Sequence, residues 1–322
     1  MHVDLPLAEL RQFRYEEPEP ADFDEFWRGT VAEQAAIPLE ATITPVEQEL
    51  TTVDVCDIEF GGCDGARIKG WLIRPARAEG PLPAVVEYIG YGGGRGLPVE
   101  SLAYACAGFA HFIMDTRGQG STWRTGDTTD PAGTPPANPG HLTRGILDPR
   151  RYYYRRLYVD AYRFVDVVKG VAGIDHDRIV ATGRSQGGAL SVVVGGLRDD
   201  LAWLAPHVTF LAAFRRALRV TEQGPLGELK RWLAIHRTKA DRAFATLGYF
   251  DAVFFARRAR TPASFCVGLA DLVAPPSSVF AVHNDYAGEK RMTVWEFNGH
   301  EAGGPEDQLR VIREVRALGR RA

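Results

Sequence analysis

A short Gly-x-Ser-x-Gly motif at residues 183–187 most tightly constrains how this chain can fold. Residues 178–182 (Arg-Ile-Val-Ala-Thr), just before it, are typical of a buried strand, and residues 189–194 (Ala-Leu-Ser-Val-Val-Val) can continue as a helix. A strand, a sharp turn and a helix in this order predict a nucleophile elbow, which exposes the serine side chain at the end of the strand. The two glycines let the strand and the helix approach each other closely. We therefore predict that Ser185 is a catalytic nucleophile.

Charge and cysteine content exclude several classes of partner. The 322 residues carry 38 basic and 41 acidic side chains, so a net charge of −3 gives no electrostatic reason to bind nucleic acid or an anionic membrane. Paired arginines along the chain are interpreted as solvated helix faces or ion pairs rather than as a binding patch. The four cysteines lack metal-ligand spacing, so we expect no metal and no cofactor. Neither a leader nor an apolar run of membrane-spanning length is visible, which favours the cytoplasm.

The order of the expected elements indicates an α/β-hydrolase fold with a mostly parallel, doubly wound sheet. Strands and helices alternate over residues 84–200, which is typical of parallel strands joined by crossover helices. Strands are expected at residues 84–89, 110–114, 178–182, 263–268 and 291–297, helices at 21–36, 101–108, 152–170 and 305–318, and a hairpin at 51–60 and 66–74.

We treat residues 1–322 as a single α/β-hydrolase domain with two additions. Residues 1–80 form an N-terminal helix and β extension, and residues 212–258 form a helical insertion near the active site. An insertion at the sheet's edge would shape the substrate pocket in this fold.

A serine nucleophile needs a general base and a carboxylate that orients the base. In this fold the three residues follow the chain order serine, acid, histidine, and the acid and histidine lie just after late strands. Asp271 follows the strand expected at 263–268 on a glycine-containing turn, and His300 follows the last strand on a glycine turn. We predict Ser185, Asp271 and His300 as the catalytic triad.

Other acids and histidines are weaker candidates for these roles. Asp271 could instead cap the helix that follows it, and Asp285 is its nearest rival. Among the histidines, His283 lies in the middle of a helix, while His207 and His236 belong with the insertion.

The oxyanion hole is expected between the elbow and a glycine-rich loop at residues 90–94. The backbone N–H of Gln186 lies at the start of the elbow helix, where it can stabilise an oxyanion. We predict the N–H of Tyr91 as the second donor, and place the Tyr91 side chain at the acyl pocket as a substrate-binding group. The loop lacks the spacing of a phosphate-binding motif. Arg117, expected to end the strand beside the elbow, is interpreted as a structural brace.

Four motifs together resemble the acetyl xylan esterase and cephalosporin C deacetylase family of carbohydrate esterases. They are residues 88–96 (Tyr-Ile-Gly-Tyr-Gly-Gly-Gly-Arg-Gly), 115–120 (Asp-Thr-Arg-Gly-Gln-Gly), 183–188 (Gly-Arg-Ser-Gln-Gly-Gly) and 300–301 (His-Glu). The resemblance implies the same triad and oxyanion donors. It also implies hydrolysis of acetyl esters on xylo-oligosaccharides and on cephalosporin C-type compounds through an acyl-enzyme, with no cofactor. Members of this family are intracellular and often form hexamers, so a hexameric homo-oligomer is expected.

Departures from the family pattern leave the alcohol side of the substrate open. Gly92 stands where many members have Asn, and residues 97–108 contain Tyr104 as their one aromatic residue. A short-chain carboxylesterase, a thioesterase, a peptidase and a non-catalytic scaffold remain alternatives. A peptidase usually needs a larger cap than this chain can supply, and a scaffold normally loses triad residues.

Overall fold

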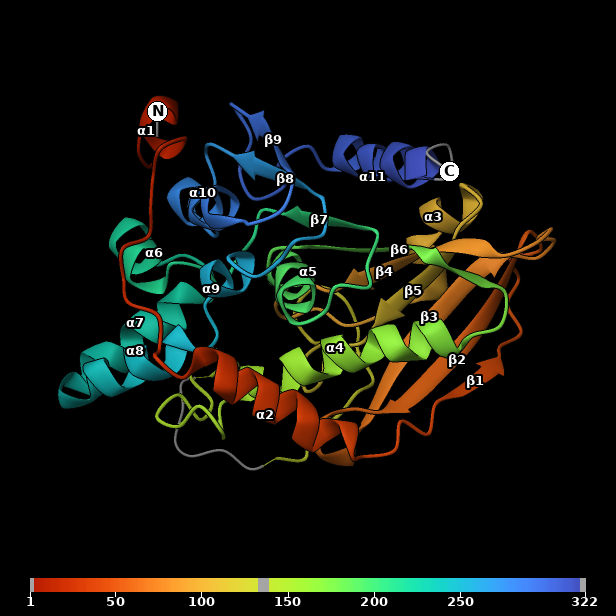
Figure 1. Ribbon diagram of the computed structural model, residues 1–322, viewed down its shortest axis with the longest axis horizontal. Coiled ribbons are helices and arrows are strands. Elements are labelled where there is room, and N and C mark those ends of the chain that lie inside the picture. The colour runs from red at the N-terminus through yellow and green to blue at the C-terminus, as the bar shows by residue number, and fades with distance from the viewer. Residues whose placement is uncertain (1–2, 133–138, 319–322) are drawn as a thin grey trace.

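A nine-stranded sheet runs through the part of the chain that the computed structural model describes, residues 3–132 and 139–318 (Figure 1). Across the sheet the strands follow the order β1-β2-β3-β5-β4-β6-β7-β8-β9. Their bounds are β1 Thr42–Pro45, β2 Val53–Gly61, β3 Arg67–Pro75, β4 Leu82–Tyr88, β5 Ala110–Met114, β6 Ile174–Arg184, β7 Trp203–His207, β8 Ala263–Gly268 and β9 Lys290–Trp295.

The sheet combines a parallel half with an antiparallel extension. Strands β5, β4, β6, β7, β8 and β9 run parallel to one another, whereas β1, β2 and β3 pair antiparallel and join the sheet at β5. The predicted α/β-hydrolase fold, with its mostly parallel sheet and N-terminal β extension, is confirmed. One placement was wrong: the strand before Arg117 is β5, and β4 separates it from the elbow strand β6.

Helices cover both faces of the sheet, as a doubly wound fold requires. Figure 1 shows α3 and α11 on one side of the sheet and α4 and α5 on the other. Side chains on alternate positions of β4 and β6 divide between these layers, because successive residues of a strand point to opposite faces. Val85 and Val180 pack with α3 and α11, whereas Val86 and Ala181 pack with α4 and α5.

The helices are α1 Leu7–Leu10, α2 Phe23–Ala35, α3 Ala103–Cys106, α4 Tyr153–Gly170, α5 Gln186–Leu197, α6 Phe214–Val220, α7 Leu226–Ile235, α8 Ala240–Gly248, α9 Ala252–Ala256, α10 Pro276–Asp285 and α11 Pro305–Leu318. Short 3-10 turns lie at Cys63–Gly65, Pro98–Ser101 and Arg237–Lys239. The helix expected at 101–108 is confined to the single turn of α3, because Gly108, with φ 93°, ends it and leads into β5.

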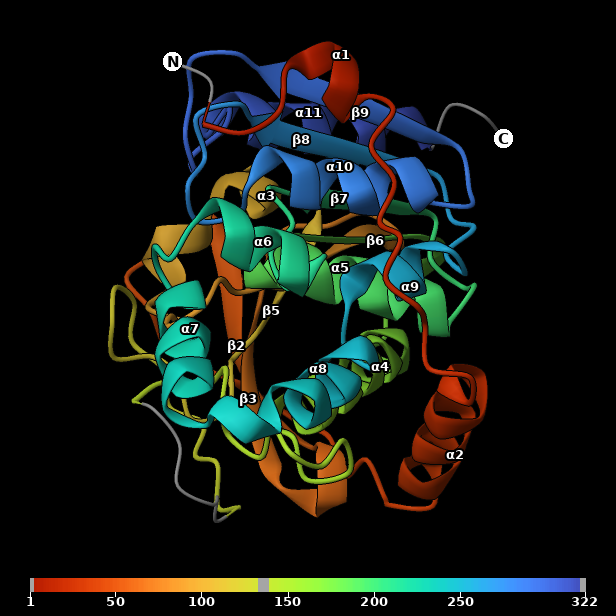
Figure 2. The same cartoon turned by 90° about the vertical axis from the view of Figure 1, so that its left-hand side faces the viewer.

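The N-terminal segment and the insertion add further helices beyond those that cover the sheet. Figure 2 shows α6, α7 and α8 grouped together, with α2 on the opposite side below α9. Helix α2 buries Phe23 and Trp27 against aromatic side chains of the same chain, Phe250 and Phe255. Its apolar face is therefore part of the molecule's own core. The division into one domain with an extension at 1–80 and an insertion at 212–258 stays a prediction.

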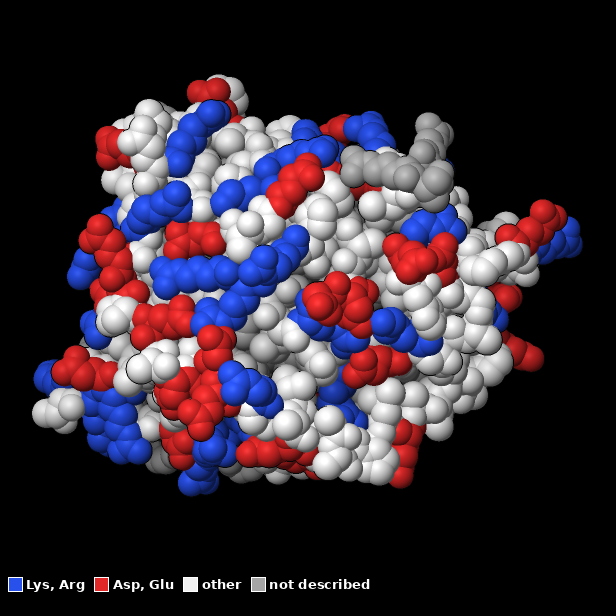
Figure 3. Space-filling view, in the orientation of Figure 1, with Lys and Arg blue, Asp and Glu red and all other residues white. Residues whose placement is uncertain are grey.

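Charges of both signs alternate on the surface. Figure 3 shows Lys and Arg side chains interspersed with Asp and Glu over the face in view. Two of the paired arginines bear out the ion-pair interpretation: Arg257 contacts Glu19 and Asp285, and Arg258 contacts Glu19 and Asp24. The Arg320-Arg321 pair lies outside the described residues. None of the described helices combines the length and the hydrophobicity needed to cross a bilayer.

Candidate active site

Ser185 occupies a strained turn between β6 and α5. Its backbone has φ 59° and ψ −117°, a conformation that residues with a side chain rarely adopt. Backbone hydrogen bonds hold it there: the Ser185 N–H donates to the carbonyl of His207 at 2.9 Å, and the Ser185 carbonyl accepts from Phe210 at 3.1 Å. The elbow predicted from the sequence is present, with the serine at its apex.

The glycines of the elbow are required by close backbone approach. A Cβ at Gly187 would lie 2.0 Å from the carbonyl oxygen of Tyr88, and one at Gly183 would lie 2.5 Å from the carbonyl carbon of Gly187. Both distances are too short for non-bonded atoms. The helix can therefore start this close to β4 because positions 183 and 187 carry no side chain.

Asp271 and His300 are joined by a hydrogen bond. Oδ2 of Asp271 accepts from Nδ1 of His300 at 2.8 Å. The other carboxylate oxygen, Oδ1, accepts the backbone N–H groups of Val273 and Ala274 at 2.8 and 2.9 Å. Because Nδ1 faces a carboxylate, it carries the hydrogen, and Nε2 is left as a proton acceptor. This tautomer, assigned from the hydrogen bond, is the one a general base needs.

Ser185 and His300 line the same cavity, of about 760 Å³. We call it the Ser185 cavity; it is also lined by Tyr91, Trp123 and Glu228. Among the described residues the Ser185 hydroxyl makes no hydrogen bond to His300 or to another side chain. Catalytic hydrogen bonds of this kind often tighten only when substrate binds. The structure thus brings the three predicted triad residues to one place and joins two of them directly.

Arg184 holds the loop that carries His300. Its guanidinium Nη1 donates to the carbonyl of His300 at 3.0 Å and to the carbonyl of Glu301. Glu301 supports the same loop, because its Oε1 accepts from Asn298 at 3.0 Å and from the N–H of Gly299 at 3.2 Å. The sequence motifs contained Arg184 and Glu301, but their spacing did not indicate these contacts.

Tyr91 and Gln186 present backbone N–H groups beside the elbow. Tyr91 lies in the turn after β4, and Gln186 is the first residue of α5, where helical N–H groups have no partner in the helix. Within the described part of the chain, neither N–H donates a backbone hydrogen bond. That both groups donate to an oxyanion on a Ser185 adduct stays a prediction.

Two glutamine side chains connect the glycine-rich loop to the elbow. Oε1 of Gln119 accepts the N–H of Gly92 at 2.6 Å, and Nε2 of Gln119 donates to Oε1 of Gln186 at 3.1 Å. Nε2 of Gln186 in turn donates to the carbonyl of Ile89 at 3.1 Å. These bonds fix the backbone on both sides of Tyr91. The sequence analysis quoted Gln119 in a motif without assigning it this position.

The Tyr91 side chain is bound by the insertion. Its hydroxyl donates to Glu228 of α7 and accepts from the N–H of His141 at 2.5 Å. Burial raises the pKa of the Tyr91 phenol, so it stays protonated and can donate. Burial also raises the pKa of Glu228. Glu228 was missed, although its i, i+4 relation to Trp232 places it on the apolar face of α7.

The weaker candidates have other partners. Asp285 pairs with Arg14 and Arg257 at the surface. Nδ1 of His283 lies 3.0 Å from the side chain of its neighbour Asn284. His207 was wrongly placed with the insertion: it ends β7, a strand the sequence analysis did not predict. Asp271 does not cap α10, whose N-cap is Pro275.

Arg117 lies beneath the site as a buried brace. Its Nε and Nη2 donate to the two carboxylate oxygens of Asp160 at 2.5 and 2.7 Å, and both residues are buried. Its carbonyl accepts from Tyr153 at 2.7 Å. In the described part of the chain no group of three or more His, Cys, Asp or Glu side chains is arranged to hold a metal ion.

Comparisons with known proteins give consistent results. The family model described as "Acetyl xylan esterase (AXE1)" matches residues 1–314. The acetyl esterase Axe7A of Xylanibacter ruminicola is 27% identical over 290 residues, which cover 87% of this chain and 63% of that protein. This chain thus spans less than two thirds of the length of that curated relative.

Two solved structures are similar over nearly their whole length. The acetyl xylan esterase from Paenibacillus sp. R4 has a TM-score of 0.91 at 35% identity, covering 97% of this chain and 99% of its own. Acetyl xylan esterase 1 from Thermoanaerobacterium sp. JW/SL YS485 has a TM-score of 0.89 at 29% identity, with the same coverage of 97% and 99%.

Proposed function

Because this chain belongs to the acetyl xylan esterase family, we propose that it is a serine esterase that removes acetyl groups from small substrates. The observation that carries the proposal is the hydrogen bond of 2.8 Å between Asp271 and His300, beside a serine at a strained elbow in the same cavity. This constellation is the one that activates a serine hydroxyl for attack on a carbonyl carbon.

In the proposed mechanism Nε2 of His300 takes the proton of Ser185 as its oxygen attacks the ester carbonyl. The backbone N–H groups of Tyr91 and Gln186 bind the oxyanion that forms. His300 then donates its proton to the departing alcohol oxygen, which leaves an acetyl group on Ser185. A water molecule, deprotonated by His300, attacks this acyl-enzyme and releases acetate. Asp271 keeps Nδ1 protonated and stabilises the imidazolium formed in each half-reaction.

The substrates we propose are acetylated xylo-oligosaccharides and acetyl esters of the cephalosporin C type. The names of the relatives support the acetyl group and xylan-derived sugars. The cephalosporin-type ester rests on the resemblance described above. A short-chain carboxylesterase, a thioesterase or a peptidase would use the same triad, so the acyl and alcohol groups decide among them.

A serine replacement tests the proposal directly. Ser185→Ala should lower hydrolysis of p-nitrophenyl acetate by roughly 10³-fold or more, because only the attacking oxygen is lost. Ser191→Ala is a matched control on the same helix, since its hydroxyl donates only to the carbonyl of Gly187. A fluorophosphonate probe should label the control and fail to label Ser185→Ala. Near-normal hydrolysis by Ser185→Ala, or an inactive and unlabelled wild type, would refute the serine esterase.

We also propose a homo-oligomer, with a hexamer as the form to test. Large apolar side chains remain at the surface: Leu97 is 62% exposed, Val99 56% and Phe297 88%. Exposed apolar groups of this size can mark contacts between subunits. Sedimentation of a single species at the monomer mass of 35.5 kDa at micromolar concentration would refute this assembly. The cytoplasmic location stays a prediction.

A further inference from the structure

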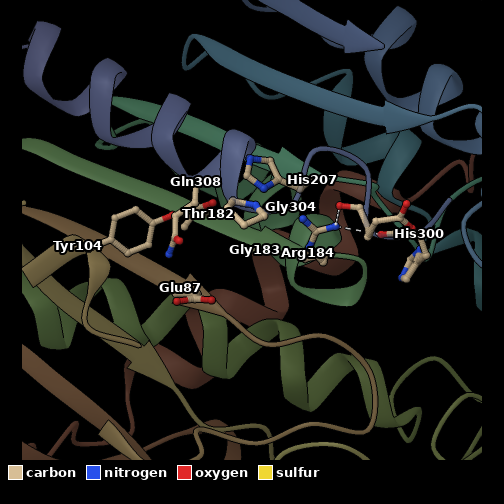
Figure 4. A pocket seen from close by; sticks show the side chains of 11 residues that line it. Glu87, Tyr104, Thr182, Gly183, Arg184, His207, His300, Gly304 and Gln308 are labelled. Atoms are coloured by element: carbon tan, nitrogen blue, oxygen red, sulfur yellow. Dashed lines mark hydrogen bonds between the residues drawn. The ribbon is translucent and has the colours of Figure 1, made fainter. Parts of the chain in front are cut away.

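A second cavity, of about 600 Å³, lies against the Ser185 cavity. We call it the His207 cavity; Glu87, Arg184 and His300 line both cavities. Figure 4 shows Tyr104, Thr182 and Gln308 together on one side of it, with Arg184 between this group and His300. Its volume lies within the range of about 300–1,000 Å³ that is typical of small-molecule sites. The proposed mechanism makes no use of it beyond the shared residues.

The cavity is built from elements on the α11 side of the sheet. Glu87 and Thr182 come from β4 and β6, Tyr104 comes from α3, and Gln308 comes from the first turn of α11. His207 ends β7, directly beside the elbow, because its carbonyl accepts the N–H of Ser185. The cavity is therefore fixed to the same strands that position the nucleophile.

Its polar groups suit a neutral ligand rich in hydroxyls. Burial acts to raise the pKa of Glu87, but the contact with His111 outweighs it, so the net pKa is lowered and the carboxylate is ionised. Burial lowers the pKa of His207 to about 4, so its ring is uncharged at neutral pH. The Arg184 guanidinium is already bound to two backbone carbonyls.

Two of these groups have unused hydrogen-bonding capacity. Among the described residues, the ring nitrogens of His207 and the side-chain amide of Gln308 make no hydrogen bond. An anionic ligand would be repelled by Glu87, and an apolar acyl chain would remove water from a carboxylate without replacing its hydrogen bonds. A sugar ring supplies hydroxyls that can donate to Glu87 and both donate to and accept from the other two.

The position of the cavity identifies the part of the substrate that would reach it. His300 must donate a proton to the departing alcohol oxygen, so the alcohol portion of the ester lies next to His300. The His207 cavity shares His300 with the Ser185 cavity but is not lined by Ser185, Tyr91 or Gln186. We propose that the His207 cavity is a sugar subsite that binds a neighbouring ring of an acetylated oligosaccharide on the alcohol side of the ester.

Because this inference rests on the proposed esterase function, two measurements separate their failures. The first is the ratio of kcat/KM for monoacetylated xylotriose to kcat/KM for monoacetylated xylose. The wild type should favour xylotriose about tenfold, mostly through KM, as expected for one or two additional hydrogen bonds. Gln308→Leu and Glu87→Gln should each lower the ratio towards one, whereas Glu306→Gln, a change at an exposed position of α11, should keep it.

The second measurement is calorimetric binding of unacetylated xylotriose to the Ser185→Ala protein, which requires no hydrolysis. Binding that Gln308→Leu weakens about tenfold in this background would support the subsite even if the protein proved not to be an esterase. A wild type that cleaves p-nitrophenyl acetate but shows equal kcat/KM for the two sugars would overturn the subsite and leave the esterase standing. A preference that survives both Gln308→Leu and Glu87→Gln would overturn it as well.

Discussion

The hydroxyl of Tyr91 lies 2.7 Å from each carboxylate oxygen of Glu228. These residues are 137 positions apart, so the contact ties the glycine-rich loop to helix α7 of the insertion. Gly140 makes room for it, because a Cβ at Gly140 would lie 2.2 Å from the Glu228 carboxylate. The backbone N–H of Tyr91 is a proposed oxyanion donor. The insertion can therefore affect catalysis by holding the side chain of the residue that supplies this donor.

Tyr91→Phe and Glu228→Gln should each lower kcat for p-nitrophenyl acetate about tenfold and change KM little, because a looser loop weakens binding of the oxyanion more than binding of the ester. The double variant should lose little more than either single variant, since both act on the same hydrogen bond, which Tyr91→Phe removes and Glu228→Gln weakens by replacing a charged acceptor with a neutral amide oxygen. Glu222→Gln, an exposed acid in the same insertion, is the control. Losses that multiply in the double variant would show that the two residues act independently.

Asp271→Asn should lower kcat by roughly 10³- to 10⁴-fold without unfolding the protein. The side-chain oxygen of Asn would keep the bonds to Val273 and Ala274, so its NH₂ group would face His300. Nδ1 would then have to accept, and Nε2 would carry the proton and could not serve as a base. Asp285→Asn is the control, because Asp285 pairs with arginines away from the cavity. A loss smaller than tenfold would contradict the assignment of Asp271.

The proposed triad could be predicted from the sequence because each member follows a local pattern. Ser185 lies between a strand and a helix, and Asp271 and His300 follow strands β8 and β9, which were predicted within two residues of their bounds. These patterns are visible in the sequence because the local backbone requires them. At the elbow, for example, the close approach of strand and helix requires glycines. Contacts between distant segments, such as Tyr91 with Glu228, leave no such pattern.

Two strands were not predicted, for a physical reason in each case. β7 contains Pro206, which normally argues against an internal strand. The pairing of β7 with β8 includes Leu204↔Ala263 and His207↔Cys266, and Pro206 lies in the gap between them; on the other side of β7, Pro206 is paired with Gly183 of β6. β1 is four residues long and mostly exposed, so it shows no alternation of buried and exposed positions. Missing β7 also led to the wrong placement of His207.

Acid should destabilise the folded protein through buried histidines. Burial lowers the pKa of His141 from 6.5 to about 4, so the folded state binds a proton less readily than the unfolded chain. The stabilisation this gives is complete above about pH 6.5 and is lost as the pH falls towards 4. Between pH 7.5 and pH 5 the free energy of unfolding of the wild type should fall by about 2 kcal/mol through this group, and His141→Gln should not show this fall. Urea denaturation at the two pH values measures both changes. His176→Gln, at an exposed position, should behave as the wild type. Equal losses in all three proteins would contradict this role of His141.

Acetyl and propionyl esters should be cleaved far faster than octanoyl esters. Trp123 lies over the glycine-rich loop, with its indole N–H donating to the carbonyl of Tyr91 at 2.8 Å, and Tyr91 itself is held by Glu228. We expect these rings to bound the acyl side of the Ser185 cavity and to exclude a long chain. A pocket that did accept one would gain about 0.8 kcal/mol for each buried CH₂. A kcat/KM that rises from C2 to C8 p-nitrophenyl esters would favour a thioesterase or a lipase-like enzyme.

Gln119 should be a positioning residue for the oxyanion hole. Its side chain accepts the N–H of Gly92 and donates to Gln186, so it spans the two segments that carry the proposed donors. Gln119→Ala would leave the loop free to move and the buried Gly92 N–H without an acceptor. We expect kcat for p-nitrophenyl acetate to fall at least tenfold, with a smaller change in KM. Gln223→Ala, at an exposed position, controls for loss of a glutamine side chain.

Gln119→Glu separates the two contacts, because it keeps the acceptor for Gly92 and loses the donor to Gln186. If the Gly92 contact is the important one, Gln119→Glu should retain more activity than Gln119→Ala. A fall in thermal stability with an unchanged kcat in both variants would show that Gln119 only stabilises the fold.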